Sequence, residues 1–349
     1  MPNALLTEAI DTLSSRRDLS GEQAGAVLGE IMHGDASEIQ IAGFLIALRT
    51  KGETVEELAG LARTMRELAA HVPTDRSELL DTAGTGGGRS TFNVSTTAAL
   101  IAAGAGCAVA KHGNRSATSR SGSADVLEAL GARIDLAPAG VAACIDEAGF
   151  GFMFAPAHHQ ATRFVVPVRH ELAVRTIFNL LGPLTNPAGA SSQLVGVSDR
   201  AFLEKMGGAL ALLGVSRALV VSSEDGLDEV SCSAPTRVVE LEGGELHSYV
   251  LAPKDAGVEP DGGELIAGGT PQENAALARA IVQPGAKAPP GEALAAINAG
   301  AAIYAAGGAA SIAEGVVAAR EAIADGRALA ALDGYVAASL RHAPSRAEA

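Results

Sequence analysis

The chain is poor in aromatic residues and in positive charge. Aromatic residues make up 3% of its 349 residues and tryptophan is absent, which favours close packing of small side chains over an aromatic binding platform. The 26 lysine and arginine residues face 40 acidic residues, so the formal net charge is −14 at pH 7. This balance argues against nucleic acid or an anionic membrane as the main partner.

Cysteines and long hydrophobic runs are also scarce. Cys107, Cys144 and Cys232 are isolated, odd in number and without metal-ligand spacing, which indicates a reducing compartment and three small core residues. The first residues lack the basic and apolar regions of a signal peptide, so we expect a cytoplasmic protein. The apolar tracts near 98–110 and 293–310 are weakly hydrophobic and interrupted, the second by Asn298, and therefore predict buried elements rather than membrane spans.

The N-terminal part has helical patterns throughout. Capping-box patterns begin at Ser20, Ser37 and Thr54, and Gly34 and Gly52 supply helix ends. No strand pattern precedes Leu79. We therefore predict a helical domain over residues 1–72, followed by a short linker around 72–77.

From Leu79 onward, short apolar strands alternate with helices. Strands are predicted at Ala108–Ala110, Phe152–Phe154, Gln193–Val197 and Ala218–Val221, helices at Ser95–Ala103, Ser123–Leu130 and Ala201–Leu213, and a hairpin over Thr236–Glu242 and Glu245–Leu251. Such alternation predicts an α/β fold, with a mostly parallel central sheet and flanking helices over residues 78–349. The pattern becomes helical again between Pro156 and Pro187.

Two polar loops suited to an anion lie between Asp81 and Asp125. In the first, the glycines of Gly84-Thr85-Gly86-Gly87-Gly88 allow backbone N–H groups to approach a phosphate. Ser95-Thr96 then precedes an apolar run, as at a helix N-terminus, which also favours an anion. The second loop begins at Lys111 and adds the positive charges of Lys111, Arg115 and Arg120. Either loop alone could be an ordinary solvated turn, but together they predict a grip on both ends of one phosphorylated ligand.

The spacing of the first loop matches neither common nucleotide motif. A Walker loop that ended at Gly88 would place Ala83 at its first glycine and Arg89 at its lysine. A dinucleotide fingerprint that began at Gly84 would fail at its last position, which Arg89 occupies. The sequence also shows no Ser-His-Asp or Cys-His pattern, so we assign no residue as a nucleophile or as a general acid or base.

An acidic turn follows the apolar strand Ala-Leu-Val-Val-Ser-Ser. Asp225, Asp228 and Glu229 would lie at the carboxyl end of that strand, where ligands bind in open α/β sheets. Spacing alone leaves a solvated turn and a Mg2+ site equally open. Two phosphate loops nearby favour Mg2+, which bridges carboxylates to phosphate oxygens.

These segments together carry a resemblance to a known family. The chain contains Thr91-Phe92-Asn93-Val94-Ser95-Thr96, a nearly unbroken match from Lys111 to Gly131, the run from Pro167 to Ala188, and Asp225 to Glu229. In these runs and the glycine loop it resembles the anthranilate phosphoribosyltransferases, and the likeness extends through most of the chain. The resemblance implies transfer of a phosphoribosyl group from 5-phosphoribosyl 1-diphosphate to anthranilate, with Mg2+, in tryptophan biosynthesis. It also implies a homodimer, and a helical domain made discontinuous by a segment of about 156–190.

The resemblance also assigns site residues. Those expected to bind phosphoribosyl diphosphate are Gly84, Gly86, Gly87, Gly88, Thr91, Asn93, Val94, Ser95, Thr96, Lys111, His112, Gly113, Asn114, Arg115, Ser116, Ala117, Thr118, Ser119 and Ser123. Anthranilate is expected at Gly84, His112, Asn114 and Arg169, since an arginine can pair with its carboxylate. The metal is expected at Ser95, Asp228 and Glu229.

The glycine loop departs from the family pattern. Gly88 stands where the family usually has aspartate, and the loop is one residue shorter before Thr91. We expect that carboxylate to be dispensable, because backbone N–H groups supply most contacts in such a loop. On this hypothesis, loss of the Arg89 side chain matters little and Gly86→Val is far more damaging.

Other interpretations remain open. Arg175 is expected to be structural, and the adjacent His158 and His159 are assigned no metal because neighbouring residues do not face one site. A pyrimidine-nucleoside phosphorylase also has glycine and lysine-serine loops. The altered loop at Gly88 would also suit a non-catalytic ligand-binding relative.

Overall fold

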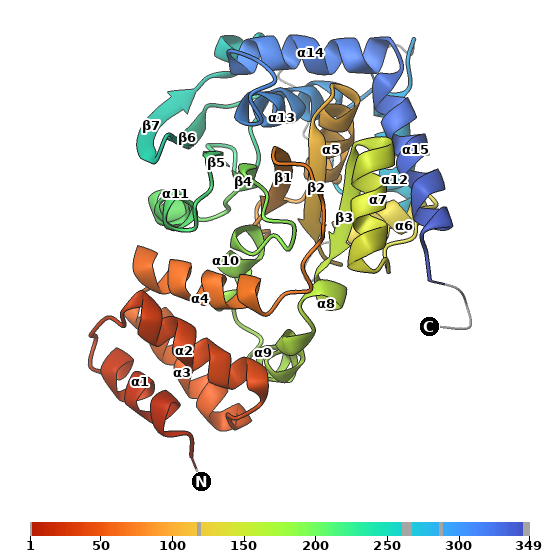
Figure 1. Ribbon diagram of the computed structural model, residues 1–349. Coiled ribbons are helices and arrows are strands. Elements are labelled where there is room, and N and C mark those ends of the chain that lie inside the picture. Colours follow the sequence, from red (N-terminus) through yellow and green to blue (C-terminus); the bar gives the residue numbers. More distant parts are fainter. Residues whose placement is uncertain (1, 117–119, 260–266, 286–288, 345–349) are drawn as a thin grey trace.

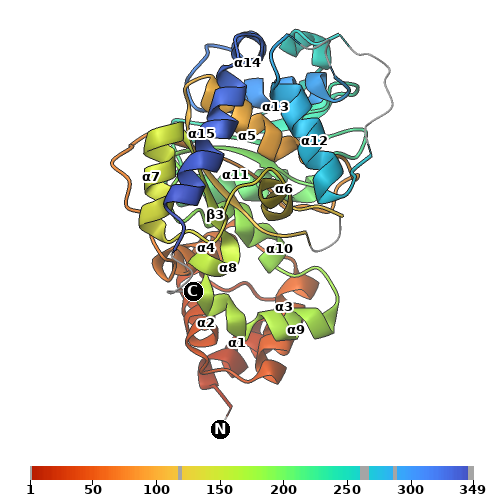
Figure 2. The same ribbon diagram turned by 90° about the vertical axis from the view of Figure 1, so that its right-hand side faces the viewer.

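The computed structural model describes residues 2–116, 120–259, 267–285 and 289–344. Four helices gather at one end of the molecule (Figure 1), with bounds α1 Ala4–Ser14, α2 Gly21–His33, α3 Glu38–Lys51 and α4 Val55–Glu67. Figure 2 shows this bundle below the larger α/β part. The described residues before Leu79 contain no strand, as the sequence predicts.

The start signals of these helices act largely as expected. Reciprocal capping boxes begin α2 at Ser20 and α4 at Thr54. At α3 the box is wrong: Ser37 accepts from the Gln40 N–H, but the Gln40 side chain accepts a hydrogen bond from the Asn3 backbone and donates one back to it. Gln40 therefore ties α3 to the start of α1 instead of closing its own N-terminus.

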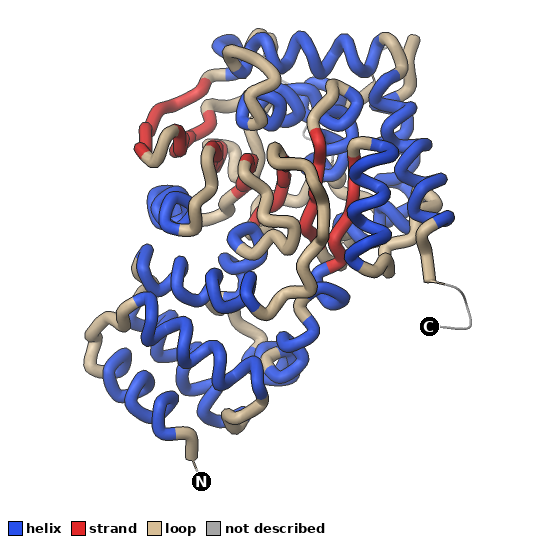
Figure 3. The backbone as a smooth tube through the Cα atoms, viewed as in Figure 1, coloured by secondary structure: helices blue, strands red, loops and turns tan. Residues whose placement is uncertain are grey.

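A seven-stranded sheet forms the centre of the larger part, and Figure 3 shows its strands, in red, among the helices. The order is β3-β2-β1-β4-β5-β6-β7. The first five strands in this order are parallel, β6 runs antiparallel to β5, and β7 runs antiparallel to β6. The bounds are β1 Leu79–Gly84, β2 Ala108–Gly113, β3 Phe150–Phe154, β4 Ser192–Gly196, β5 Arg217–Ser223, β6 Thr236–Glu242 and β7 Glu245–Leu251. The predicted mostly parallel sheet and its terminal hairpin are confirmed.

Helices cover both faces of this sheet. They are α5 Val94–Gly104, α6 Ser123–Ala129, α7 Pro138–Ala148, α11 Leu203–Leu212, α12 Pro271–Val282, α13 Glu292–Ala305, α14 Ile312–Ala324 and α15 Arg327–Arg341, with 3-10 turns η3 Arg200–Phe202 and η4 Pro253–Ala256. Alternation along the strands divides the core: Leu219 and Val221 lie in one apolar cluster, whereas Val220 lies in the other. The second cluster continues into the N-terminal bundle, so α11 and α4 join the two parts.

The segment after β3 returns to the N-terminal helices. It forms only short elements, α8 Ala155–His158, η1 Gln160–Phe164, α9 Val166–Leu172, α10 Phe178–Leu181 and η2 Gly182–Leu184. Val165, Val168 and Ile177 are buried in the same apolar cluster as the bundle, and α9 packs against α3. The smaller helical part therefore includes chain from two separate stretches.

Glycines allow some helices to touch through their backbones. A Cβ atom added at Gly315 would overlap the carbonyl oxygen of Gly300, so α13 and α14 approach with no room for a methyl group. Gly29 in α2 is the opposite case, because a Cβ atom there would meet nothing within 4 Å.

We therefore predict opposite effects of alanine at these two glycines. Gly315→Ala should lower the free energy of unfolding by about 1–3 kcal/mol through overpacking, despite the better helix propensity of alanine. Gly29→Ala should leave it unchanged or raise it by up to about 1 kcal/mol. Urea denaturation followed by circular dichroism measures both, and equal effects would contradict the close helix contact.

Candidate functional site

The predicted loops meet at one edge of the sheet. The glycine loop follows β1, the loop from Lys111 includes the end of β2, and the acidic turn follows β5. These strands are parallel and lie in the order β2-β1-β4-β5, so their carboxyl ends share an edge. Only β4 separates the glycine loop from the acidic turn, and it ends at Gly196.

A backbone hydrogen bond fastens the glycine loop to the acidic turn. The N–H of Arg89 donates to the carbonyl of Gly226 at 2.8 Å, and the N–H of Gly86 lies close enough to the Asp228 carboxylate to oppose the rise in its pKa. Gly86 and Gly87 have φ values of +63° and +87°, in the left-handed region that favours glycine. The two segments therefore form one unit.

Gly88 packs directly against Asp228. A Cβ atom added at Gly88 would overlap Oδ1 of Asp228 and lie 2.8 Å from its backbone nitrogen. An aspartate at position 88 does not fit this loop, which gives the departure from the family pattern a physical reason. A Cβ atom added at Gly86 would meet no described protein atom within 4 Å, so within the protein only the positive φ of Gly86 opposes a side chain.

The metal candidates Asp228 and Glu229 are half-buried beside each other. Burial, followed by the negative charge of Asp228, raises the pKa of Glu229 to about 8. The backbone N–H of Ser95 lies close enough to the Glu229 carboxylate to oppose this shift, so the three predicted ligands lie close together. Asp225 does not join them, because its carboxylate accepts hydrogen bonds from the hydroxyls of Ser223 and Ser231. The described residues contain no cluster of three or more His, Cys, Asp or Glu side chains that could hold a metal.

Lys111 lies behind the site rather than at its surface. Its ammonium group donates to the carbonyl of Thr82 and lies 3.1 Å from the Thr82 hydroxyl and 3.4 Å from Oγ of Ser95. Burial lowers the pKa of Lys111 and raises that of Asp81, and the attraction between the two opposes both shifts. Asp81 also accepts from the His112 N–H at 3.0 Å and from the Asn186 amide at 2.8 Å.

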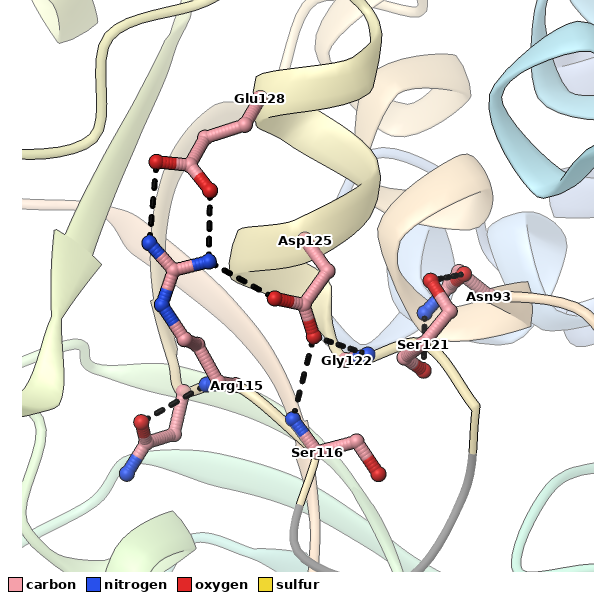
Figure 4. Close-up of polar contacts among 8 residues, drawn as sticks. Asn93, Arg115, Ser116, Ser121, Gly122, Asp125 and Glu128 are labelled. Carbon is pink, nitrogen blue, oxygen red and sulfur yellow. Dashed lines mark hydrogen bonds and ion pairs between the residues drawn. The ribbon is translucent and has the colours of Figure 1, made fainter. Parts of the chain in front are cut away.

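The carboxylates of Asp125 and Glu128 hold the second loop in place (Figure 4). The Asp125 carboxylate accepts from the N–H groups of Ser116 and Gly122 at 3.3 and 2.8 Å. The Arg115 guanidinium pairs with Asp125 at 2.8 Å and with Glu128 at 2.6 and 3.0 Å. Arg115 therefore neutralises nearby carboxylates and braces the loop.

Asn93 connects three parts of the chain. Its side-chain oxygen accepts from the Ser121 hydroxyl at 3.0 Å and from the Asn274 amide at 2.8 Å, while its own amide donates to the Ser121 carbonyl at 3.1 Å. Figure 4 shows the contacts between Asn93 and Ser121. The side chain predicted to touch the ligand thus orders the N-terminus of α5 against the second loop and α12.

The anthranilate candidates come from both parts of the molecule. His112 is buried, its Nδ1 lies 3.0 Å from the Gly182 carbonyl, and its ring centroid lies 5.1 Å from that of His159. Arg169 on α9 lies 5.4 Å above the Phe178 ring, and within the described chain no carboxylate lies within 4 Å of its guanidinium. Asn114 is exposed, and its side-chain oxygen accepts from the Arg115 N–H at 2.7 Å.

The remaining predicted residues fall into three groups. Gly84, Thr91 and Val94 belong to the glycine loop or the start of α5, and the Thr96 hydroxyl is buried there without a partner among the residues described. Gly113 and Ser123 pack together, since a Cβ atom at Gly113 would lie 3.1 Å from Cβ of Ser123. Ala117, Thr118 and Ser119 lie outside the described residues.

Sequence reasoning missed several residues that hold the site. Asn298 of α13 accepts from the Val230 N–H at 2.9 Å and donates to the Val230 carbonyl at 2.8 Å, beside Glu229. The sequence does offer a signal for Asn298, because it is a polar residue within an alanine-rich tract. Asp81, Asn186 and Asn274 gave none, because their partners lie far away in the sequence.

A separate cavity of about 530 Å³ lies between η3, α11 and the β6–β7 hairpin and shares no residue with this site. Among the described helices, none combines the length and apolar character needed to cross a membrane.

Comparison with known proteins defines the class. Residues 7–69 match the helical bundle domain of a glycosyl transferase family, and residues 76–329 match the α/β domain of the same family. The solved structure of anthranilate phosphoribosyltransferase from Thermus thermophilus superposes with a TM-score of 0.89 at 46% identity, covering 95% of this chain and 99% of that one.

Relatives of known sequence narrow the class further. Anthranilate phosphoribosyltransferase from Chromohalobacter salexigens is 50% identical over 318 residues, which is 90% of this chain and 92% of that protein. The enzyme from Rubrobacter xylanophilus is 49% identical over 338 residues, covering 97% of this chain and 98% of its own. The chain therefore belongs to the anthranilate phosphoribosyltransferase family of glycosyl transferases.

The contact between Gly88 and Asp228 gives a stability prediction. Gly88→Ala should lower the free energy of unfolding by about 1–3 kcal/mol, because the methyl group forces the loop and the acidic turn apart. Arg89→Ala removes an exposed side chain and should change it by less than about 0.5 kcal/mol. Equal urea midpoints for the two variants would show that the loop relaxes freely around a side chain at position 88.

His112 gives a prediction about pH. Burial and the neighbouring His159 lower its pKa from 6.5 to about 3, so the folded protein keeps His112 neutral while the unfolded chain protonates it. Stability from this residue is complete above pH 6.5 and is lost as the pH falls towards 3. Between pH 6.5 and 5 the loss should be roughly 1–2 kcal/mol.

Substitution separates this effect from other acid-sensitive groups. His112→Asn cannot titrate, so its unfolding free energy should fall less between pH 6.5 and 5 than that of the unchanged protein. His170→Asn, which removes an exposed histidine, is the control and should keep the original dependence. Identical pH profiles for all three proteins would show that His112 is not held neutral.

Proposed function

We propose that this protein transfers the phosphoribosyl group of 5-phosphoribosyl 1-diphosphate to the amino nitrogen of anthranilate. The products are N-(5-phosphoribosyl)anthranilate and diphosphate, in tryptophan biosynthesis. The observation that carries the proposal is the junction of glycine loop, second loop and acidic turn at one sheet edge, in a chain of this family. Related structures from Saccharomyces cerevisiae contain PRPP and Mg in one case and 4-fluoroanthranilate in another.

The acidic turn suits Mg2+. Burial raises the pKa values of the neighbouring carboxylates Asp228 and Glu229, and the charge of Asp228 adds to the rise at Glu229. A divalent cation would favour the ionised form of both groups. Ser95 adds a hydroxyl oxygen beside them, and hard oxygen ligands are those that Mg2+ prefers. When bound, the ion neutralises charge on the diphosphate leaving group.

The chain's own groups position the reactants. The bond from the ribosyl carbon to the diphosphate oxygen breaks, a bond to the anthranilate nitrogen forms, and the amine loses a proton. The glycine-loop amides stabilise the negative charge that grows on the diphosphate. The buried ammonium group of Lys111 contacts Ser95 and Thr82. Its positive charge partly offsets the negative charges of Asp81 and Glu229. A good leaving group makes a protein nucleophile unnecessary, so correct placement of the substrates supplies much of the rate.

The anthranilate carboxylate is assigned to Arg169. Its guanidinium is half-buried and, in the part of the chain that the structure describes, has no acidic partner, so it is available for a carboxylate. Gly84, His112 and Asn114 are the other residues that we propose contact anthranilate.

We also propose that the helical domain comprises residues 1–72 together with about 156–190, and the α/β domain residues 78–349. The shared apolar cluster supports this division.

A homodimer would cover the exposed side chains of Ile39 and Ile46 on α3, which are 84% and 38% accessible. Sedimentation should give the mass of two copies. The isolated cysteines support a cytoplasmic location.

Loss of anthranilate fluorescence tests the function directly. The protein should consume anthranilate only when phosphoribosyl diphosphate and Mg2+ are both present, and excess chelator should stop the reaction. Phosphate with a pyrimidine nucleoside should give no product. Turnover of the nucleoside instead would support the phosphorylase, and no turnover with either would support a non-catalytic binding protein.

The Arg169 assignment predicts a selective loss. Arg169→Ala should raise the anthranilate KM by roughly tenfold or more, because a charge-assisted contact contributes about 1.5–3 kcal/mol. Binding of phosphoribosyl diphosphate, measured without anthranilate, should stay within about threefold. Arg163→Ala, an exposed arginine on the same segment, is the control. An unchanged anthranilate KM would place the carboxylate elsewhere.

A further inference from the structure

Arg175 contacts the glycine loop from the helical side. It lies in the loop between α9 and α10, and both of its terminal nitrogens are 3.2 Å from the carbonyl oxygen of Gly86. The Ser198 hydroxyl donates to the same oxygen at 2.9 Å. No carboxylate of the described residues lies within 4 Å of the Arg175 guanidinium, so this carbonyl is its principal polar partner.

These donors fix the orientation of one peptide group. A trans peptide is planar, so the carbonyl of Gly86 and the N–H of Gly87 point in opposite directions. With the carbonyl held by Arg175 and Ser198, the Gly87 N–H must face away from them. It donates to no acceptor among the described residues, whereas the Gly86 N–H lies close enough to the Asp228 carboxylate to oppose the rise in its pKa. The Gly87 N–H is therefore an oriented hydrogen-bond donor that is available to a ligand.

The fit around this contact is close. A Cβ atom added at Gly87 would overlap Nη1 of Arg175, so position 87 needs glycine both for its φ of +87° and for the arginine. Ala173, two residues before Arg175, ends α9 in the left-handed region at φ +50°, which is unusual for alanine. This sharp turn separates Arg175 from the helix that carries Arg169.

We propose that Arg175 is a positioning residue that holds the Gly86–Gly87 peptide in the orientation that receives the diphosphate of the first substrate. This inference rests on the proposed function. Because Arg175 and Arg169 belong to one short segment, the same contact links the diphosphate loop to the helix that carries the anthranilate arginine. The charge of Arg175 also acts on Asp228.

Binding of Mg2+ and phosphoribosyl diphosphate, measured by calorimetry without anthranilate, tests the proposal. Arg175→Ala should weaken binding by about tenfold. Arg175→Lys should also bind more weakly than the unchanged protein, since lysine keeps the charge but lacks the planar fork. Arg163→Ala removes one exposed positive charge from the same segment and should bind normally. Thermal unfolding should show all variants folded at the assay temperature.

A double-mutant cycle distinguishes positioning from direct contact with the substrate. If Arg175 and Ser198 act through the shared carbonyl, the loss in Arg175→Ala/Ser198→Ala should differ from the product of the single losses by more than about twofold. Independent effects, full affinity in Arg175→Ala, or full affinity in Arg175→Lys would each overturn the proposal. Failure of the unchanged protein to bind phosphoribosyl diphosphate would instead overturn the proposed function.

Discussion

Close backbone packing around Asp228 is the constraint on which the site depends. A Cβ atom on Gly196 would overlap the Asp228 carbonyl oxygen, one on Gly88 would overlap its carboxylate, and one on Gly84 would lie 3.5 Å from Oδ2. The glycine loop and the end of β4 therefore approach one acidic residue closely because they present only backbone there. This packing brings the backbone amides of the glycine loop next to the carboxylates of the acidic turn, and it leaves no room for a side chain at position 88.

Charge is distributed so that the acidic chain can still hold an anionic substrate. The net charge of −14 would repel a diphosphate, yet the residues beneath the loops are arranged in compensated groups. Asp81 and Lys111 balance each other in the interior, and Arg115 is matched by Asp125 and Glu128. Asp228 and Glu229 are compensated only in part, by Arg175 and Lys111, because burial still raises the pKa values of both acids. In the proposed site, amides and hydroxyls would therefore face the substrate, and a bound Mg2+ would supply much of the positive charge.

The sequence predicted the class of fold and most of the segments of the site, because those depend on local patterns. Alternation gave the parallel strands, capping residues gave the starts of α2 and α4, and the glycine and lysine loops were found where the strands end. It could not give contacts between distant residues. Gln40 satisfies the Asn3 backbone instead of its own cap, Asn93 binds Asn274, and Arg175, expected to be structural, reaches Gly86. The steric role of Gly88 also required the position of Asp228 in space.

The two parts of the molecule are joined in two physically different ways. Behind the site, α4 and α11 share an apolar cluster, which resists separation because opening it would expose hydrophobic surface to water. Near the site the contacts are polar, from Arg175 to the Gly86 carbonyl and from His112 to the Gly182 carbonyl. A polar contact can be exchanged for water at little net cost, whereas an apolar one cannot. Relative movement of the two parts should therefore pivot about the apolar joint and alter the polar contacts, which lie beside the proposed substrate site.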